Sequence, residues 1–400
     1  MVLVSLQPAA RHRPMGKWLP EHRPAIQQWI ASKLKEAKQK YDLPLDPSLV
    51  AFQQVVNSTP DWQRLSNNMF TQSSKNYDPT GKPAVRSFGD FVNVVNLIIQ
   101  SAPPFFDRDE PPTAMGMVAL PINAVLDWPM GTIAGYHFWL IPAINSSFKD
   151  VLNTWGSFLK SSASRTGLKG WLSKDALSLL ANAANTDIPD GPPFARIFVC
   201  DPAAPYYGYG SWGDFFTRQF RDGMRPVAFP DDAPPTPECS DPTLVLTNAC
   251  ESAPLKVVEN VKLQDQFWLK SQHYSLDRML NQSPMTTQLV GGTVYQAFLS
   301  AKSYHRWHAP LSGTVAEIDQ VAGSYYGENL FEGLVGDPQS PDPAAPNYSQ
   351  PYISAVATRA IIWIKADNRV IGLMAIVFMG MVEVSGCEFT VASGDHITKG

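Results

Sequence analysis

Cysteine is scarce in this chain, with only four among 400 residues: Cys200, Cys239, Cys250 and Cys387. No two of them have the Cys-x-x-Cys spacing of a zinc or redox motif, and a disulfide scaffold needs a much higher density. We therefore expect a reduced compartment, the cytoplasm, and no metal site.

An excess of positive charge is also missing. Lys and Arg total 32 against 36 for Asp and Glu, which gives a net charge of -4. This balance excludes a nucleic-acid-binding protein that relies on a basic surface. No apolar run approaches the roughly 20 residues that span a bilayer, and the nearest, at 371–382, ends at Glu383 and favours a buried strand. The N-terminus lacks the order of a secretory signal, since its apolar residues precede its basic ones.

The residues that are present predict a large folded core. Hydrophobic residues make up 44% and charged residues 17% of the chain, and 400 residues suit two or three domains. We expect a helical domain over residues 1–190, because apolar side chains recur there at helical spacing. Pro24 suits a first helical turn, and Ser87 with Asp90 resembles a capping box. The three clearest stripes are Ile26, Trp29, Ile30, Leu34 and Ala37; Phe88, Phe91, Val92, Val95 and Ile99; and Phe148, Val151, Leu152, Trp155, Phe158 and Leu159.

Residues 191–400 predict a β-rich domain, so the expected fold class is α+β. Proline-rich stretches at 226–242 and 336–352 predict long loops or linkers. The expected strands are 194–200, 244–246, 292–297, 314–318, 360–365 and 371–384, and a short helix is expected over 214–220. Two glycine-marked strand and turn units, 308–323 and 384–400, suggest the hairpin sandwich of biotinyl and lipoyl domains.

The densest chemical cluster is Tyr-His-Arg-Trp-His-Ala-Pro at residues 304–310. Two histidines lie three residues apart beside an arginine and two aromatic rings. A metal site would need a third ligand, and no carboxylate or cysteine pattern accompanies the pair. Proton transfer fits better, because histidine titrates near neutral pH. A loop with two structural histidines is the alternative.

This segment resembles the YHRxHxP signature of the phosphatidylserine decarboxylase family. Two more segments agree in chain order: residues 214–218 with 225–227 resemble the family's EFFTR…RP segment, and residues 269–280 resemble its KGxxYSLxxLL segment. The resemblance covers about residues 194–400. The chain as a whole resembles most the fungal branch that contains L-tryptophan decarboxylase.

The resemblance implies a decarboxylase that uses a covalent pyruvoyl group. In this family a serine of a Gly-Ser-Ser or Gly-Ser-Thr motif cleaves its preceding peptide bond and becomes the pyruvoyl N-terminus of a small subunit. The pyruvoyl carbonyl forms a Schiff base with the substrate amine and accepts electrons as CO₂ leaves. By its position in the motif, His308 resembles the residue that activates the serine. His305 resembles the residue that assists decarboxylation or reprotonation.

Three departures from the family pattern stand out. The family's Pro-x-Asp-Gly segment, whose Asp orients the cleavage histidine, corresponds to residues 248–252, so Glu251 replaces the Asp with one more methylene. An exposed turn carboxylate without a catalytic role is the alternative for Glu251. Lys270-Ser271 also replaces the usual Lys-Gly.

The third departure is that no Gly-Ser-Ser or Gly-Ser-Thr follows the histidine motif up to Gly400. We expect these residues to correspond to a large subunit whose partner is its own C-terminal small subunit, and to be inactive alone. A processed chain, a fragment and a truncated gene product all remain open.

The expected substrate is a free amino acid, and the resemblance to the fungal branch implies an aromatic side chain. A polybasic stretch or an apolar anchor would favour a lipid substrate, and we find neither in this sequence. Phosphatidylserine is the second candidate. A non-catalytic binding or regulatory relative is the third, and the missing serine motif favours it.

Overall fold

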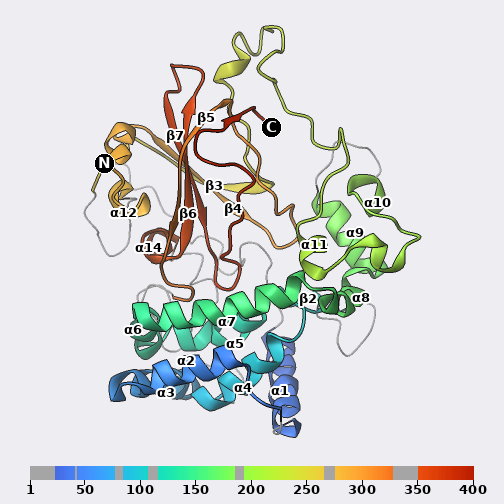
Figure 1. Cartoon of the computed structure of the whole chain (residues 1–400), viewed down its shortest axis with the longest axis vertical. Helices are drawn as coiled ribbons and strands as arrows, with labels where there is room; N and C mark the ends of the chain where they lie inside the picture. Colours follow the sequence, from blue (N-terminus) through green and yellow to red (C-terminus); the bar gives the residue numbers. More distant parts are fainter. Residues whose placement is uncertain are drawn as a thin grey trace, which may run out of the picture.

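The computed structural model describes residues 23–40, 43–76, 84–106, 116–184, 193–264, 275–327 and 350–400. Figure 1 shows helices stacked at one end, an antiparallel sheet standing on them, and a lobe of short helices to one side. The arrangement is α+β, as the sequence predicts. Within the described ranges, every helix is too short or too polar to cross a bilayer.

The helical layers bury the three apolar stripes that the sequence predicts. Ile26, Trp29 and Ile30 are almost inaccessible, as are most members of the other two stripes. The hydroxyl of Ser87 accepts a hydrogen bond from the Asp90 amide at 3.1 Å, which caps the fourth helix as expected. These layers contain α1 (Arg23–Gln39), α2 (Pro47–Asn57), α3 (Pro60–Asn76), α4 (Phe88–Ile98), α5 (Pro121–Met130), α6 (Ile133–Trp139) and α7 (Pro142–Lys160).

The side lobe contains a second apolar core. One strand predicted from the sequence is not formed there. Residues 194–200 do not form the expected strand, because Phe194, Ile197 and Phe198 are buried at helical spacing. The expected helix at 214–220 is shorter and ends at Phe216. The lobe consists of η2 (Ser162–Gly167), α8 (Leu168–Trp171), α9 (Lys174–Ala183), α10 (Phe194–Ile197), η3 (Pro205–Gly208) and α11 (Trp212–Phe216), beside the short pair β1 (Phe105–Phe106) and β2 (Gly116–Met117).

The main sheet has the strand order β7-β6-β5-β8, and all its pairs are antiparallel. Its strands are β5 (Gly313–Val321), β6 (Arg359–Ala366), β7 (Leu373–Met379) and β8 (His396–Ile397). A separate ribbon pairs β3 (Ser252–Glu259) with β4 (Thr293–Leu299). The strands expected near 292–297, 314–318, 360–365 and 371–384 are therefore confirmed, with adjusted ends. The lipoyl-type sandwich is not confirmed.

Residues 244–246 are not the strand that the sequence predicts. The Asp241 carboxylate accepts from the Thr243 amide at 3.0 Å, and Pro242 begins the 3₁₀ turn η4 (Pro242–Leu244). The remaining short elements are α12 (Leu276–Met279), η5 (Pro284–Leu289) and α14 (Gln350–Val356). The second proline-rich stretch, 336–352, lies mostly outside the described residues, as does the predicted domain boundary at 190/191, which stays a prediction.

Glu383 joins the sheet to the helical layers. Its carboxylate accepts hydrogen bonds from the amides of Ile122 at 2.8 Å and Asn123 at 3.1 Å, both in the first turn of α5. The Tyr326 hydroxyl donates to the same carboxylate at 3.1 Å. Burial nevertheless raises the pKa of Glu383 from 4.5 to about 7.

We expect the Glu383→Gln substitution to flatten the dependence of stability on pH. Because the folded-state pKa of Glu383 is raised, the folded state binds the proton more tightly, and wild-type stability falls as pH rises from about 4.5 to 7. Glutamine keeps an acceptor for α5 and carries no charge, so the stability of the variant relative to wild type should increase by up to about 3 kcal/mol between pH 4.5 and 8.

Urea unfolding at several pH values measures this difference. Glu388→Gln is a matched control, because Glu388 lies five residues away and its side chain is largely exposed, at 77%. Equal pH dependence of the unfolding free energy in wild type and Glu383→Gln would contradict the prediction.

Candidate active site

The histidine segment 304–310 connects β4 to β5 and runs beside residues 247–251. The His308 amide donates to the Ala249 carbonyl at 2.7 Å, and the Thr247 amide donates to the Pro310 carbonyl at 3.0 Å. These bonds bring the two halves of the predicted site together, although more than 50 residues separate them. Glu251 therefore lies against the histidine segment.

The imidazole of His308 is solvent-accessible and has two polar neighbours. Nδ1 lies 3.3 Å from the Gly400 carbonyl oxygen, and Nε2 lies 3.4 Å from the Tyr304 hydroxyl oxygen. A carbonyl oxygen can only accept, so this arrangement assigns the proton to Nδ1 and leaves Nε2 as the basic nitrogen. The Tyr304 and His308 rings are stacked, with centroids 5.7 Å apart. His308 thus has a defined orientation, with the lone pair of its basic nitrogen facing the Tyr304 hydroxyl.

His305 faces the interior of the side lobe. Its ring stacks on Phe216 with centroids 4.0 Å apart, and its Nε2 is buried. Burial, reinforced by the nearby Arg218 charge, lowers the pKa of His305 to about 3. His305 is therefore a neutral imidazole at physiological pH, which can donate one hydrogen bond but holds no imidazolium proton to give away.

Arg218 connects residues 214–218 to the start of the histidine segment. Its guanidinium is buried and donates to the carbonyls of Lys302 at 3.0 Å and Ser303 at 3.4 Å, immediately before the histidine motif. The guanidinium also lies 4.5 Å from the centre of the Phe198 ring. Desolvation lowers the pKa of Arg218 to about 10, so the group stays charged at neutral pH. Arg218 fixes the start of the histidine segment.

Glu251 is not the exposed turn carboxylate of the alternative interpretation, since its side chain is only 12% exposed. One oxygen pairs with Arg225, and the other accepts from the Tyr304 amide at 2.8 Å. The direct contact with the His308 ring that the family pattern implies is not formed. Glu251 instead holds the backbone of Tyr304, whose side chain in turn contacts His308.

Comparisons with known proteins identify the family of this chain. Two family models, both described as phosphatidylserine decarboxylase, match residues 46–180 and 212–400. L-tryptophan decarboxylase of Psilocybe cubensis is 37% identical over 327 residues, which is 79% of this chain and 69% of that protein. The chain belongs to the phosphatidylserine decarboxylase family.

Two further relatives show the breadth of this family. The decarboxylase iboD of Amanita muscaria is 37% identical over 75% of this chain and 85% of its own length. Phosphatidylserine decarboxylase proenzyme 3 of Schizosaccharomyces pombe is 25% identical over 52% of this chain, but over only 19% of its own length. This phosphatidylserine decarboxylase family member therefore resembles enzymes named for both amino-acid and phospholipid substrates.

Sequence reasoning missed several residues of the site. Arg225 and Tyr304 were seen only as parts of motifs, and their contacts with Glu251 and His308 depend on tertiary packing. A signal for Arg225 was present, because an arginine beside Pro226 is part of the motif that resembles the family. The Lys270-Ser271 departure lies outside the described residues.

Proposed function

We propose that this protein is a pyruvoyl-dependent decarboxylase of an aromatic amino acid, similar to L-tryptophan. The observation that carries the proposal is the 3.3 Å contact between Nδ1 of His308 and the Gly400 carbonyl, because it holds an imidazole, the side chain suited to act as the base of self-cleavage, beside the chain that follows β8. Relatives named L-tryptophan decarboxylase at 37% and 36% identity support the substrate class. The family proenzymes support a small subunit, made by self-cleavage, as the partner of this chain.

A pyruvoyl group would supply the electron-accepting carbonyl that amino-acid side chains lack. The residues of this chain would do the rest. Nε2 of His308 takes the proton of the attacking hydroxyl during self-cleavage. Glu251 and Tyr304 hold the imidazole in place. By the family resemblance His305 assists decarboxylation or reprotonation, and its low pKa would make it act as a neutral imidazole rather than as a charged acid.

The test is a chain continued past Gly400 with the corresponding C-terminal segment of the Psilocybe cubensis relative. We expect it to cut itself into two subunits and to release ¹⁴CO₂ from carboxyl-labelled L-tryptophan. Phosphatidylserine in mixed vesicles is the second substrate arm, because the Schizosaccharomyces pombe relative is named for it. Turnover of the lipid alone would replace the substrate assignment. Cutting without turnover of either would favour the non-catalytic interpretation.

The Glu251 contacts predict different effects for two substitutions in this continued chain. Glu251→Gln keeps an acceptor for the Tyr304 amide, so self-cleavage should slow by less than about tenfold. Glu251→Ala removes that acceptor and lets the His308 segment move, which should slow cleavage by roughly 10²-fold. Gel analysis of cleavage time courses measures both. Equal losses in the two variants would show that the carboxylate charge, and not the backbone contact, matters.

A further inference from the structure

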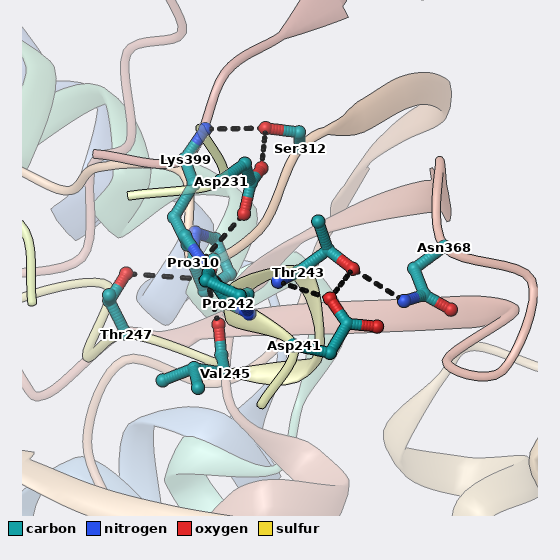
Figure 2. A network of polar contacts seen from close by, with 10 residues as sticks. All are labelled: Asp231, Asp241, Pro242, Thr243, Val245, Thr247, Pro310, Ser312, Asn368 and Lys399. Atoms are coloured by element: carbon teal, nitrogen blue, oxygen red, sulfur yellow. Dashed lines mark hydrogen bonds and ion pairs between the residues drawn. The ribbon is translucent and has the colours of Figure 1, made fainter. Parts of the chain in front are cut away.

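Lys399 is a buried charged residue close to the histidine segment. Its side chain is 1% exposed, and Nζ lies 2.6 Å from an oxygen of Asp231. Nζ also donates to the carbonyls of Pro242 at 2.7 Å and Val245 at 3.2 Å, so all three ammonium protons have acceptors (Figure 2). A buried ammonium is costly without such partners, which makes this a well-defined site.

The same network holds the backbone of the chain end. The Lys399 amide donates to the Ser312 hydroxyl at 2.9 Å, and that hydroxyl donates to Asp231 (Figure 2). The loop that carries the acceptors is itself tied to the sheet, because the Asn368 side chain donates to the Thr243 hydroxyl at 2.6 Å. In Figure 1 this loop climbs from the side lobe to the end of the sheet where the C-terminus lies.

The network sets the position of Gly400. Its amide donates to the Ala309 carbonyl at 2.9 Å, and its carbonyl faces His308. Gly400 has φ +91°, and a Cβ there would collide with the Val227 side chain, so the site accepts only glycine without strain. Strand pairing alone fixes this end weakly, because β8 has two residues.

We propose that the buried Lys399–Asp231 pair is a positioning device that holds the chain following β8 in register with His308 for self-cleavage. The inference rests on the proposed function. Lys399 acts through the backbone: its side chain binds the 231–245 loop, and its amide and the next residue run antiparallel to residues 309–312. The scissile segment then begins at a fixed distance from the imidazole.

The first experiment uses residues 1–400 and needs no self-cleavage. In Lys399→Met, which keeps an apolar stem but loses the charge, we expect amide hydrogen exchange at Gly400 to accelerate at least about tenfold and the His308 ring resonances to shift. Unchanged Gly400 protection and His308 resonances would overturn the proposal.

Arg359→Met is the matched control. Arg359 is also a buried cation that donates to backbone carbonyls, those of Met279, Arg278 and Ala357, but it lies at the opposite end of β6 from the β5–β8 pair. We expect this variant to lose thermal stability and to leave Gly400 and His308 unchanged. Equal responses of Gly400 and His308 in both variants would mean that Lys399 contributes only general stability.

The second experiment uses the chain continued past Gly400. Lys399→Met should cut roughly 10²-fold more slowly than wild type, as expected for a misplaced reacting group, whereas Arg359→Met should cut near the wild-type rate. Wild-type cleavage by Lys399→Met would overturn the positioning role. A wild-type continued chain that fails to cut would refute the proposed function instead, and the exchange experiment would still decide the role of Lys399.

Discussion

His308→Ala will leave the continued chain uncut. Attack of a serine hydroxyl on a peptide carbonyl needs a base, and loss of one general base typically slows a reaction by roughly 10²–10⁴-fold. The structure places Nδ1 of His308 against the Gly400 carbonyl and Nε2 against the Tyr304 hydroxyl, so the imidazole is held beside the chain that follows β8. Denaturing gel electrophoresis over several days should show one full-length band.

His396→Ala is the control for this experiment. His396 lies in β8, four residues before Gly400, and pairs with Asp367 on the surface at 2.8 Å. Its loss removes a histidine close to the chain end without touching the His308 ring, so cleavage should proceed. Normal cleavage in His308→Ala would remove His308 from the role of base.

His305→Ala will give a chain that still cuts but turns over slowly. The residue lies on the lobe side of the segment, stacked on Phe216, whereas it is His308 that contacts Gly400. We expect turnover of the substrate to fall by roughly 10²–10⁴-fold, because the family resemblance gives His305 a role in decarboxylation or reprotonation. The amounts of cleaved subunit and of released CO₂ measure the two steps separately.

The low pKa of His305 adds a sharper expectation. A group with a pKa of about 3 is already neutral throughout the range from pH 5 to 8, so the pH profile of turnover in wild type should contain no step due to His305. Phe216→Leu controls for packing, because it removes the ring that His305 stacks on and keeps the imidazole. An uncut His305→Ala chain would reverse the roles of the two histidines, and full activity would make His305 structural.

The sequence predicts the helical half of this protein well because its core is periodic. Stripes such as Ile26, Trp29 and Ile30 depend on local spacing, and the Ser87 cap depends on a neighbour three residues away. Prediction failed where burial came from distant partners. The prediction of a strand over residues 194–200 is wrong because a short apolar run fits a strand and a buried helix equally well. The packing of these residues in the core of the side lobe decides between the two.

In the candidate active site, too, some residues could be identified from the sequence and others could not. The histidines and Glu251 could be identified from motifs, because spacing along the chain is all that a motif needs. The partners of Glu251 could not, since Arg225 and the Tyr304 amide reach it from segments 26 and 53 residues away. The buried pair of Lys399 with Asp231 left no pattern at all, because it joins a loop to a chain end.

The contacts of Lys399 also set an order of events during folding. The bond from Lys399 to Pro242 closes a loop of 157 residues, and the one from His308 to Gly400 closes a loop of 92. Contacts between such distant residues form late, because the entropy of closing the loop must be overcome first. During synthesis, His308 would therefore meet Gly400, and take up its proposed role as base, only after the sheet and the 231–245 loop have assembled. Premature cutting of a half-folded chain would be suppressed by topology alone.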